Sequence, residues 1–385
     1  MEAHSSTEGS AKSRINLLIL GGGPIAQAFT IRCGNQGIKT TLCGPGDCHD
    51  LPGIQAGKIK TKGTLVTGRY SDNFIRSFPV SVSLDIAHAI SAANYILIIM
   101  TLPARHQFLK QLGETYDFTG KVLGSTNGAE DAPLIVKYTN ASYGVGFACH
   151  PIIATIEDGM LYVQDQPASI PTTVVATTKE GTHPDRDGVL EDLKTILTMH
   201  LLFMQPWEAF SRDPTLDLYG VPAIVMWNEI NAGSNEPFVH HMNNIENAFL
   251  RNALHSDKWA INKALGWSVP ETFTILNGKH RTDHETLFDC LNDRDIVRSL
   301  MTSDAPEPGN HRDFKHARSA RLWKKLGRWL GIPTPAIDRL FADAFTHGVD
   351  LWEGEDLFDK LGIKDLRDFA ACYSNPDGAA GSVET

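Results

Sequence analysis

The chain has 385 residues, of which 42% are hydrophobic and 21% are charged, enough for two or three domains with buried cores. Its formal net charge of −10 and its lack of a dense basic run exclude a general binder of nucleic acid or of membrane surfaces. The polar N-terminus, the short apolar runs and six scattered cysteines predict a cytoplasmic protein without a secretory signal, a membrane span or a metal site.

Strands and helices alternate over the first half of the chain, after a polar segment, 1–13, that we expect to be disordered. The expected strands are 16–20, 39–43, 95–101, 121–125, 145–149 and 172–177. The expected helices are 24–35, 86–92, 106–112 and 186–199. Short apolar strands separated by helices predict a Rossmann-type α/β domain over residues 14–211, with a doubly wound parallel sheet covered on both faces.

The pattern becomes almost purely helical after about residue 211. The expected helices are 221–231, 238–265, 285–289, 315–330 and 335–346. They predict a mostly α-helical second domain over residues 212–375 for substrate binding and dimerisation, followed by a disordered tail, 376–385. The basic segment 321–328 is interpreted as a solvated helix face. The long amphipathic segment 238–265 predicts that this domain forms a homodimer.

A glycine-rich turn joins the first expected strand to the first helix in the stretch LLILGGGPIAQAF. Gly21, Gly23 and Ala26 fit the spacing G-x-G-x-x-[G/A], in which glycines permit a tight turn and a close approach to a pyrophosphate. The helix N-terminus offers N–H groups and a positive dipole end to the phosphates. The sequence therefore predicts a dinucleotide cofactor. The expected cofactor-binding residues are Gly21, Gly22, Gly23, Pro24, Ile25, Ala26, Leu102, Pro103 and Asn127.

The type of dinucleotide depends on the end of the second strand, where an NAD site usually has an acid that binds the ribose 2′-hydroxyl. This chain has Cys43 followed by Gly-Pro there, and Asp47 is displaced. Three lysines in the next loop, Lys58, Lys60 and Lys62, could reach a 2′-phosphate. NADP(H) is therefore favoured over NAD(H).

Five stretches of the chain carry a wider resemblance: LLILGGGPIA, YILIIMTLPARHQFLKQL, SDKWAINKALGWSVPETFTIL, LGRWLGIPTPAID and LFDKLGIKDL. In these stretches the chain resembles the opine dehydrogenase family, including the branch that makes opine-type metallophores. The resemblance is patchy but spans nearly the whole length. It implies a Rossmann domain followed by a helical domain, and NAD(P)H-dependent condensation of a 2-oxo acid with an amine. In that reaction the imine is reduced by hydride to a secondary amine.

One departure from the family pattern affects its catalytic residues. The family has a histidine before a proline in an H-P-x(5)-N segment that opens the helical domain. The matching stretch, YGVPAIVMWNEIN, keeps Pro222 and Asn228 but has Val221 at the histidine position, and valine cannot transfer a proton. The family's later acidic pair aligns with Lys315 and His316. Proton transfer is therefore either carried out by another residue of this chain or absent from it.

Other histidines are candidates to replace the missing one, because histidine titrates near neutral pH. His150 follows an expected strand, at the carboxyl edge where α/β sheets carry their sites, and His106 follows the strand 95–101. His240 and His241 lie early in a long expected helix, where one of the two can face a cleft. Each has a structural alternative, as a loop or helix histidine. The selected catalytic candidates are His150, His106 and Asn228.

Several polar side chains are candidates to bind the substrate. Asn127 follows the fourth expected strand and could donate a hydrogen bond to a carboxylate or carboxamide, and Asn228 could orient the substrate. A guanidinium binds a carboxylate in bidentate geometry. The candidates for that clamp are Arg105, Arg312 and Arg318, and for each of them taken singly a structural salt bridge at the surface is the favoured interpretation.

Three functions remain open at this stage. The first is an opine-type reductase of an imine made from a 2-oxo acid and an amine, or of a preformed imine; an iminium is already activated for hydride, so the loss of one acid is tolerable. The second is a 2-oxo acid or ketone reductase, which needs a proton donor to the alkoxide, so Val221 counts against it unless His150 serves. The third is an NADP(H)-binding sensor or scaffold without turnover.

Overall fold

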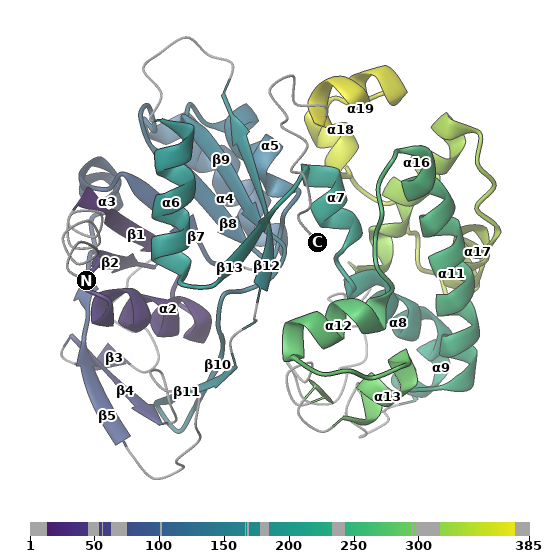
Figure 1. The fold of residues 1–385 in the computed structure, drawn as a ribbon, viewed down its shortest axis with the longest axis horizontal. Coiled ribbons are helices and arrows are strands. Elements are labelled where there is room, and N and C mark those ends of the chain that lie inside the picture. Colours follow the sequence, from purple (N-terminus) through teal and green to yellow (C-terminus); the bar gives the residue numbers. More distant parts are fainter. Residues whose placement is uncertain are drawn as a thin grey trace, which may run out of the picture. The chain divides into compact units, whose positions relative to one another are not determined.

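The computed structural model describes residues 14–44, 54–55, 57–62, 75–100, 102–165, 167, 169–177, 185–232, 243–293, 296–297 and 316–373. The chain folds into two compact units, Met1–Pro206 and Trp207–Thr385 (Figure 1). Within the described residues, no helix combines the length and the apolar character needed to cross a membrane. Both expected tails lie outside these residues, as do Asp47, His240, His241, Arg312 and Lys315.

The first unit is built on an eight-stranded sheet in the order β13-β12-β9-β8-β7-β1-β2-β6. Its strands are β1 (Asn16–Leu20), β2 (Lys39–Cys43), β6 (Ser81–Val82), β7 (Tyr95–Ile98), β8 (Val122–Thr126), β9 (Tyr143–Phe147), β12 (Ser169–Ala176) and β13 (His200–Phe203). From β9 to β6 every pair is parallel, whereas β12 pairs antiparallel with β9. The doubly wound fold is confirmed, but the expectation of parallel pairing is wrong at this edge. The segment between β9 and β12 contains a hairpin of two further strands, 153–157 and 160–165, instead of a crossover helix. The chain therefore returns to the sheet in the opposite direction.

Helices cover both faces of this sheet (Figure 1). Leu17 and Ile19 of β1 face a core that includes residues of α2 and α6, whereas Leu18 and Leu20 face a core that includes residues of α3 and α4. The two cores alternate along the strand because successive side chains point to opposite faces. The helices are α2 (Pro24–Asn35), α3 (Ile86–Ala92), α4 (Leu102–Thr115), α5 (Asp131–Tyr138) and α6 (Arg186–Leu197).

A second sheet in the first unit was not expected from the sequence. It contains β3 (Ile54–Gln55), β4 (Lys58–Lys62), β5 (Ile75–Pro79), β10 (Ile153–Glu157) and β11 (Met160–Asp165). In β4, Lys58 and Lys60 are exposed and alternate with the buried Ile59 and Thr61. The prediction of a lysine-bearing loop is therefore wrong: these lysines lie on a strand, because the alternation of exposed and buried side chains suits a half-buried sheet.

The second unit is helical. Its core centres on Trp207, which has no exposed surface and whose ring centroid lies 4.8 Å from that of Phe210 and 4.9 Å from that of Trp323. The expected helix 221–231 is interrupted at Met226. The helices are α7 (Pro206–Ser211), the π-helix η2 (Leu216–Gly220), α8 (Val221–Val225), α9 (Trp227–Asn231), α11 (Ile245–Ala264), α12 (Thr272–His280), α13 (Leu287–Asn292), α16 (Ala320–Leu330), α17 (Pro335–Thr346), α18 (Leu357–Leu361) and α19 (Leu366–Tyr373).

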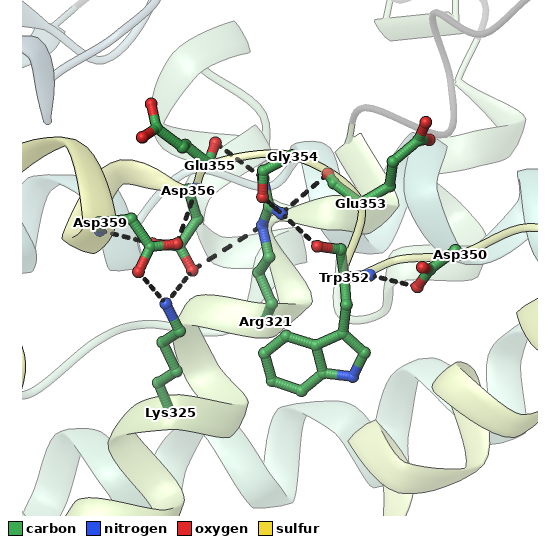
Figure 2. A network of polar contacts seen from close by, with 9 residues as sticks. All are labelled: Arg321, Lys325, Asp350, Trp352, Glu353, Gly354, Glu355, Asp356 and Asp359. Atoms are coloured by element: carbon green, nitrogen blue, oxygen red, sulfur yellow. Dashed lines mark hydrogen bonds and ion pairs between the residues drawn. The ribbon is translucent and has the colours of Figure 1, made fainter.

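The basic residues of α16 hold the loop that precedes α18 (Figure 2). Arg321 Nη1 donates to the carbonyl oxygens of Glu353 and Gly354 at 3.0 and 2.9 Å, and Nη2 donates to that of Glu355 at 3.2 Å. Lys325 Nζ lies 2.6 Å from a carboxylate oxygen of Asp356. Arg321 is only 8% exposed, so the interpretation of this segment as a solvated face is wrong for these residues. The loop supplies backbone acceptors that no local sequence pattern reveals.

Candidate active site

Gly21 lies where the ends of three strands of the first unit meet. Its N–H donates to the carbonyl of Cys43 at the end of β2, at 2.9 Å. Its φ is +153°, and a Cβ at this position would lie 2.3 Å from the carbonyl oxygen of Ile99, just after β7. The fold itself therefore requires glycine here.

Gly23 differs, because neither its backbone nor its neighbours require glycine. It is the N-cap of α2 with φ −71° and ψ 174°, and a Cβ built on it would meet no atom of the structure within 4 Å. Pro24 opens the helix, and within the described chain no side chain caps this end and no acid stands in its first turn. Ala26 is buried against the sheet, while Gly22 and Ile25 are partly exposed. This helix end thus has the space and the polarity that a phosphate group requires.

The other expected cofactor residues are only partly visible. Leu102 and Pro103 are the first residues of α4, and their side chains lie outside the described part. Cys43 ends β2 as a buried residue, so the choice between the two dinucleotides rests on the sequence and on the exposed Lys58 and Lys60.

Arg105, on α4, holds the loop between β8 and α5 through hydrogen bonds to its backbone. Its side chain has no exposed surface; Nη1 donates to the carbonyl of Thr126 at 2.7 Å and Nη2 to that of Asn127 at 3.1 Å. Its Nε forms an ion pair with Asp131. A Cβ on Gly128 would lie 2.2 Å from Nη2, so this loop closes tightly over the guanidinium. Arg105 is therefore a buried anchor, and its contacts favour the structural alternative over a substrate clamp.

Asp131, the first residue of α5, links this anchor to a histidine. It is fully buried, and His106 Nε2 lies 2.8 Å from its Oδ1 while Ser125 Oγ donates to its Oδ2 at 2.9 Å. Burial by itself raises the pKa of Asp131, but the charges of Arg105 and His106 and the hydrogen bonds from His106 and Ser125 outweigh burial and lower the pKa to about 2. The carboxylate is thus ionised near neutral pH and can only accept, so His106 carries its proton on Nε2 in this contact.

Asn127 and His150 lie at the same edge of the sheet. Asn127 directly follows β8 and has φ +58°, a left-handed conformation that asparagine tolerates better than most residues; its side chain is exposed. Thr126 Oγ1 lies 2.9 Å from His150 Nδ1, so the end of β8 holds the histidine that follows β9. His150 is partly exposed.

Three residues selected from the sequence, His106, Asn127 and His150, are therefore brought to the carboxyl edge of β7, β8 and β9. The residues that hold them, Asp131 and Thr126, were not identified from the sequence. An acid at a helix start ordinarily indicates only a favourable interaction with the helix dipole. Within the described residues, no cluster of three histidine, cysteine or acidic side chains is placed to hold a metal ion.

The second unit places the family's histidine position in its core. Val221 has no exposed surface and follows the π-helix directly, whereas Asn228 is exposed on α9. In the π-helix, both carboxylate oxygens of Asp217 accept from Lys258 Nζ, at 3.0 and 2.8 Å, and Thr272 Oγ1 donates to Oδ2 at 2.7 Å. This buried ion pair ties η2 to α11 and α12.

Two more sequence candidates lie in the second unit. His316, aligned with the family's acidic pair, has its ring centroid 5.4 Å from that of Tyr219. Arg318, a proposed carboxylate clamp, forms an ion pair with Glu353. That contact favours the structural alternative for Arg318.

No family model matches the sequence, and no curated protein matches it. Solved structures do match. An octopine dehydrogenase in complex with NADH and agmatine has a TM-score of 0.67 at 13% identity, over 94% of this chain and 99% of that one. The chain has the fold of octopine dehydrogenase. The opine dehydrogenase resemblance is thereby confirmed at the level of the fold.

Two further structures extend the comparison. A yersinopine dehydrogenase matches with a TM-score of 0.59 and 12% identity, over 91% of this chain and 97% of that one. A ketopantoate reductase from Ralstonia eutropha matches with a TM-score of 0.54 and 14% identity, over 90% and 99%. The chain therefore shares its fold with a yersinopine dehydrogenase and a ketopantoate reductase as well.

Proposed function

We propose that the chain is a nicotinamide-dependent oxidoreductase of the opine dehydrogenase type. It reduces an imine formed from a 2-oxo acid and an amine, or a preformed imine, to a secondary amine. The observation that carries this proposal is the pair of His106 and the ionised Asp131, which lies beside Asn127 at the carboxyl edge of the sheet. Octopine dehydrogenase structures that contain agmatine, L-arginine or pyruvate support an amine and an oxo acid as substrates.

The fit of a dinucleotide rests on the first turn of α2. Gly21 closes the turn and Gly23 leaves its surroundings open, so the first unit can hold the pyrophosphate at the helix N-terminus. We propose that NADP(H) is preferred, because Lys58 and Lys60 are exposed cations and the chain lacks the usual acid after β2.

The proposed roles of the residues follow from their contacts. When bound, the nicotinamide supplies the hydride. His106, oriented by Asp131, holds or releases the proton that the substrate nitrogen exchanges. Asn127 offers its exposed amide to a substrate carboxylate, and His150 is a second proton carrier held by Thr126.

Reduction of a 2-oxo acid or a ketone is the second candidate. It needs a proton donor to the developing alkoxide, which the pair of His106 and Asp131 can supply without a histidine at position 221. The ketopantoate reductase fold agrees with it as well.

One assay separates these functions. Purified protein is mixed with NADPH or NADH, a panel of 2-oxo acids, and each acid with and without amino acids or diamines. Loss of cofactor absorbance only when both partners are present supports imine reduction, whereas loss with the oxo acid alone supports ketone reduction. Bound cofactor that is never consumed, even with preformed imines, overturns both and leaves a sensor.

A further inference from the structure

Helix α11 exposes large apolar side chains on the side that faces away from its buried residues. Ile245, Phe249 and Trp259 are 72%, 69% and 52% exposed. At 100° per residue these three positions fall within one face of about 80°, and the smaller exposed Asn252 and Ser256 lie between them. The buried Leu250, Leu254 and Ile261 are on the other side. Clustered apolar exposure of this kind marks an interaction surface.

We infer that this surface, the α11 face (Ile245, Phe249, Asn252, Ser256, Trp259 and Lys263), binds a second copy of the chain with the two helices antiparallel. The order of residues along the face is self-complementary when reversed. Phe249 and Trp259 are equally far from Leu254 in sequence, and so are Asn252 and Ser256. A two-fold axis near Leu254 therefore places Phe249 opposite the partner's Trp259 in both halves of the contact.

The charges on the helix select the antiparallel arrangement. Lys263 Nζ lies 4.8 Å from the ring centroid of Trp259, and the exposed Glu246 lies one turn before Phe249. An antiparallel pair brings Glu246 and Phe249 of one copy to the partner's Lys263 and Trp259, so that acid meets base and ring meets ring. A parallel pair would instead place Glu246 beside the partner's Glu246 and align the two helix dipoles.

The middle of the face permits close approach. The two aromatic layers are about 15 Å apart along the helix, at ~1.5 Å per residue. Between them, Asn252 and Ser256 are small enough for two helices to cross at contact distance. One helix crossing is a small interface, so the dimer forms in a reversible, concentration-dependent equilibrium.

The test is sedimentation equilibrium of the full chain over a range of concentrations. The wild-type mass should rise from 42.2 kDa towards twice that value. Lys263→Glu should weaken association about tenfold, because it places two acids together at each end of the contact, and the swap Glu246→Lys with Lys263→Glu should restore it. Phe249→Ser should also weaken it, whereas Phe345→Ser, which removes a 78% exposed aromatic residue from α17, should not.

Circular dichroism and unfolding midpoints show that each variant is folded. A wild-type chain that stays monomeric at all concentrations overturns the inference. So does a dimer that tolerates Lys263→Glu, or one that the charge swap fails to restore. A monomer that loses stability on Phe249→Ser would mean that another part of the same chain covers the face, which also excludes the second copy as its occupant. These readouts do not depend on turnover.

Discussion

His106 Nε2 lies 2.8 Å from Asp131 Oδ1, and Asp131 is buried and ionised beside Arg105. A carboxylate that accepts from an imidazole fixes both the tautomer and the orientation of the ring. The first unit therefore contains an oriented histidine, while the family's histidine position in the second unit holds the buried Val221. The proposed proton transfer is assigned to the unit that carries the nucleotide turn.

Replacement of His106 tests this assignment directly. His106→Asn should lower kcat by about 10²–10⁴, the usual contribution of a general acid or base. The variant should still fold, because Asp131 keeps its ion pair with Arg105 and its hydrogen bond from Ser125, and the unfolding midpoint checks this. The matched variant is His150→Asn, which keeps a polar group beside Thr126. Full activity in the first variant with loss in the second would transfer the proton role to His150.

The buried carboxylate gives a pH dependence of stability. The pKa of Asp131 is lowered from its ordinary 3.8 to about 2, so its stabilising ionisation is complete above about pH 4 and is lost as the pH falls through about 2. The loss amounts to about 2 kcal/mol in unfolding free energy. Urea unfolding at about pH 5, 4, 3 and 2 measures it.

The control for that measurement is Asp131→Asn. It leaves Arg105 buried without its counter-charge and should cost about 3–5 kcal/mol at neutral pH. The difference between wild type and variant should shrink as the pH falls, because only the wild type loses a charge here. A difference that stays constant down to pH 2 would contradict the ionised carboxylate.

The two glycines of the turn should separate folding from cofactor binding. Gly21→Ala adds a Cβ that would lie 2.3 Å from a carbonyl oxygen at positive φ, and should lower the unfolding free energy by at least about 1–3 kcal/mol. Gly23→Ser introduces a favoured N-cap residue into open space, so stability should be kept or improved. Its Kd for NADPH, measured by calorimetry, should rise about tenfold or more. An unchanged Kd would show that the phosphate of the cofactor does not bind at this helix end.

Arg321 should contribute more to the stability of the second unit than the exposed Arg328 of the same helix. Arg321→Lys loses the planar fork that reaches the carbonyl oxygens of residues 352–355, and should destabilise the protein by about 1–3 kcal/mol (Figure 2). Arg328→Lys changes an exposed residue of the same helix and should stay within about 0.5 kcal/mol. Thermal and urea unfolding compare the two. Equal effects would show that charge alone matters on this helix.

Local patterns in the sequence are enough to predict much of the fold. The predicted bounds of β1, β2, α2, α3 and α17 agree with the structure. Three of these elements have a clear local signal: a short apolar run for β1, and a proline in the first turn, Pro24 or Pro335, for α2 and α17. The hairpin of β10 and β11 was missed although its turn, Asp158-Gly159, is a local hairpin signal. The antiparallel direction of β12 was missed because it depends on pairing with the distant β9, which leaves no local mark.

The residues of the candidate site could likewise be predicted only in part from the sequence. His106, Asn127 and His150 were selected because the carboxyl ends of parallel strands gather at one edge, which strand order alone implies. The burial of Arg105 and its contacts with residues 21 to 26 positions further along the chain were decided by the tertiary structure. The same arginine on an exposed helix would be a reasonable carboxylate clamp. What a charged side chain does depends on whether water or protein surrounds it, and packing between elements far apart in the sequence determines that.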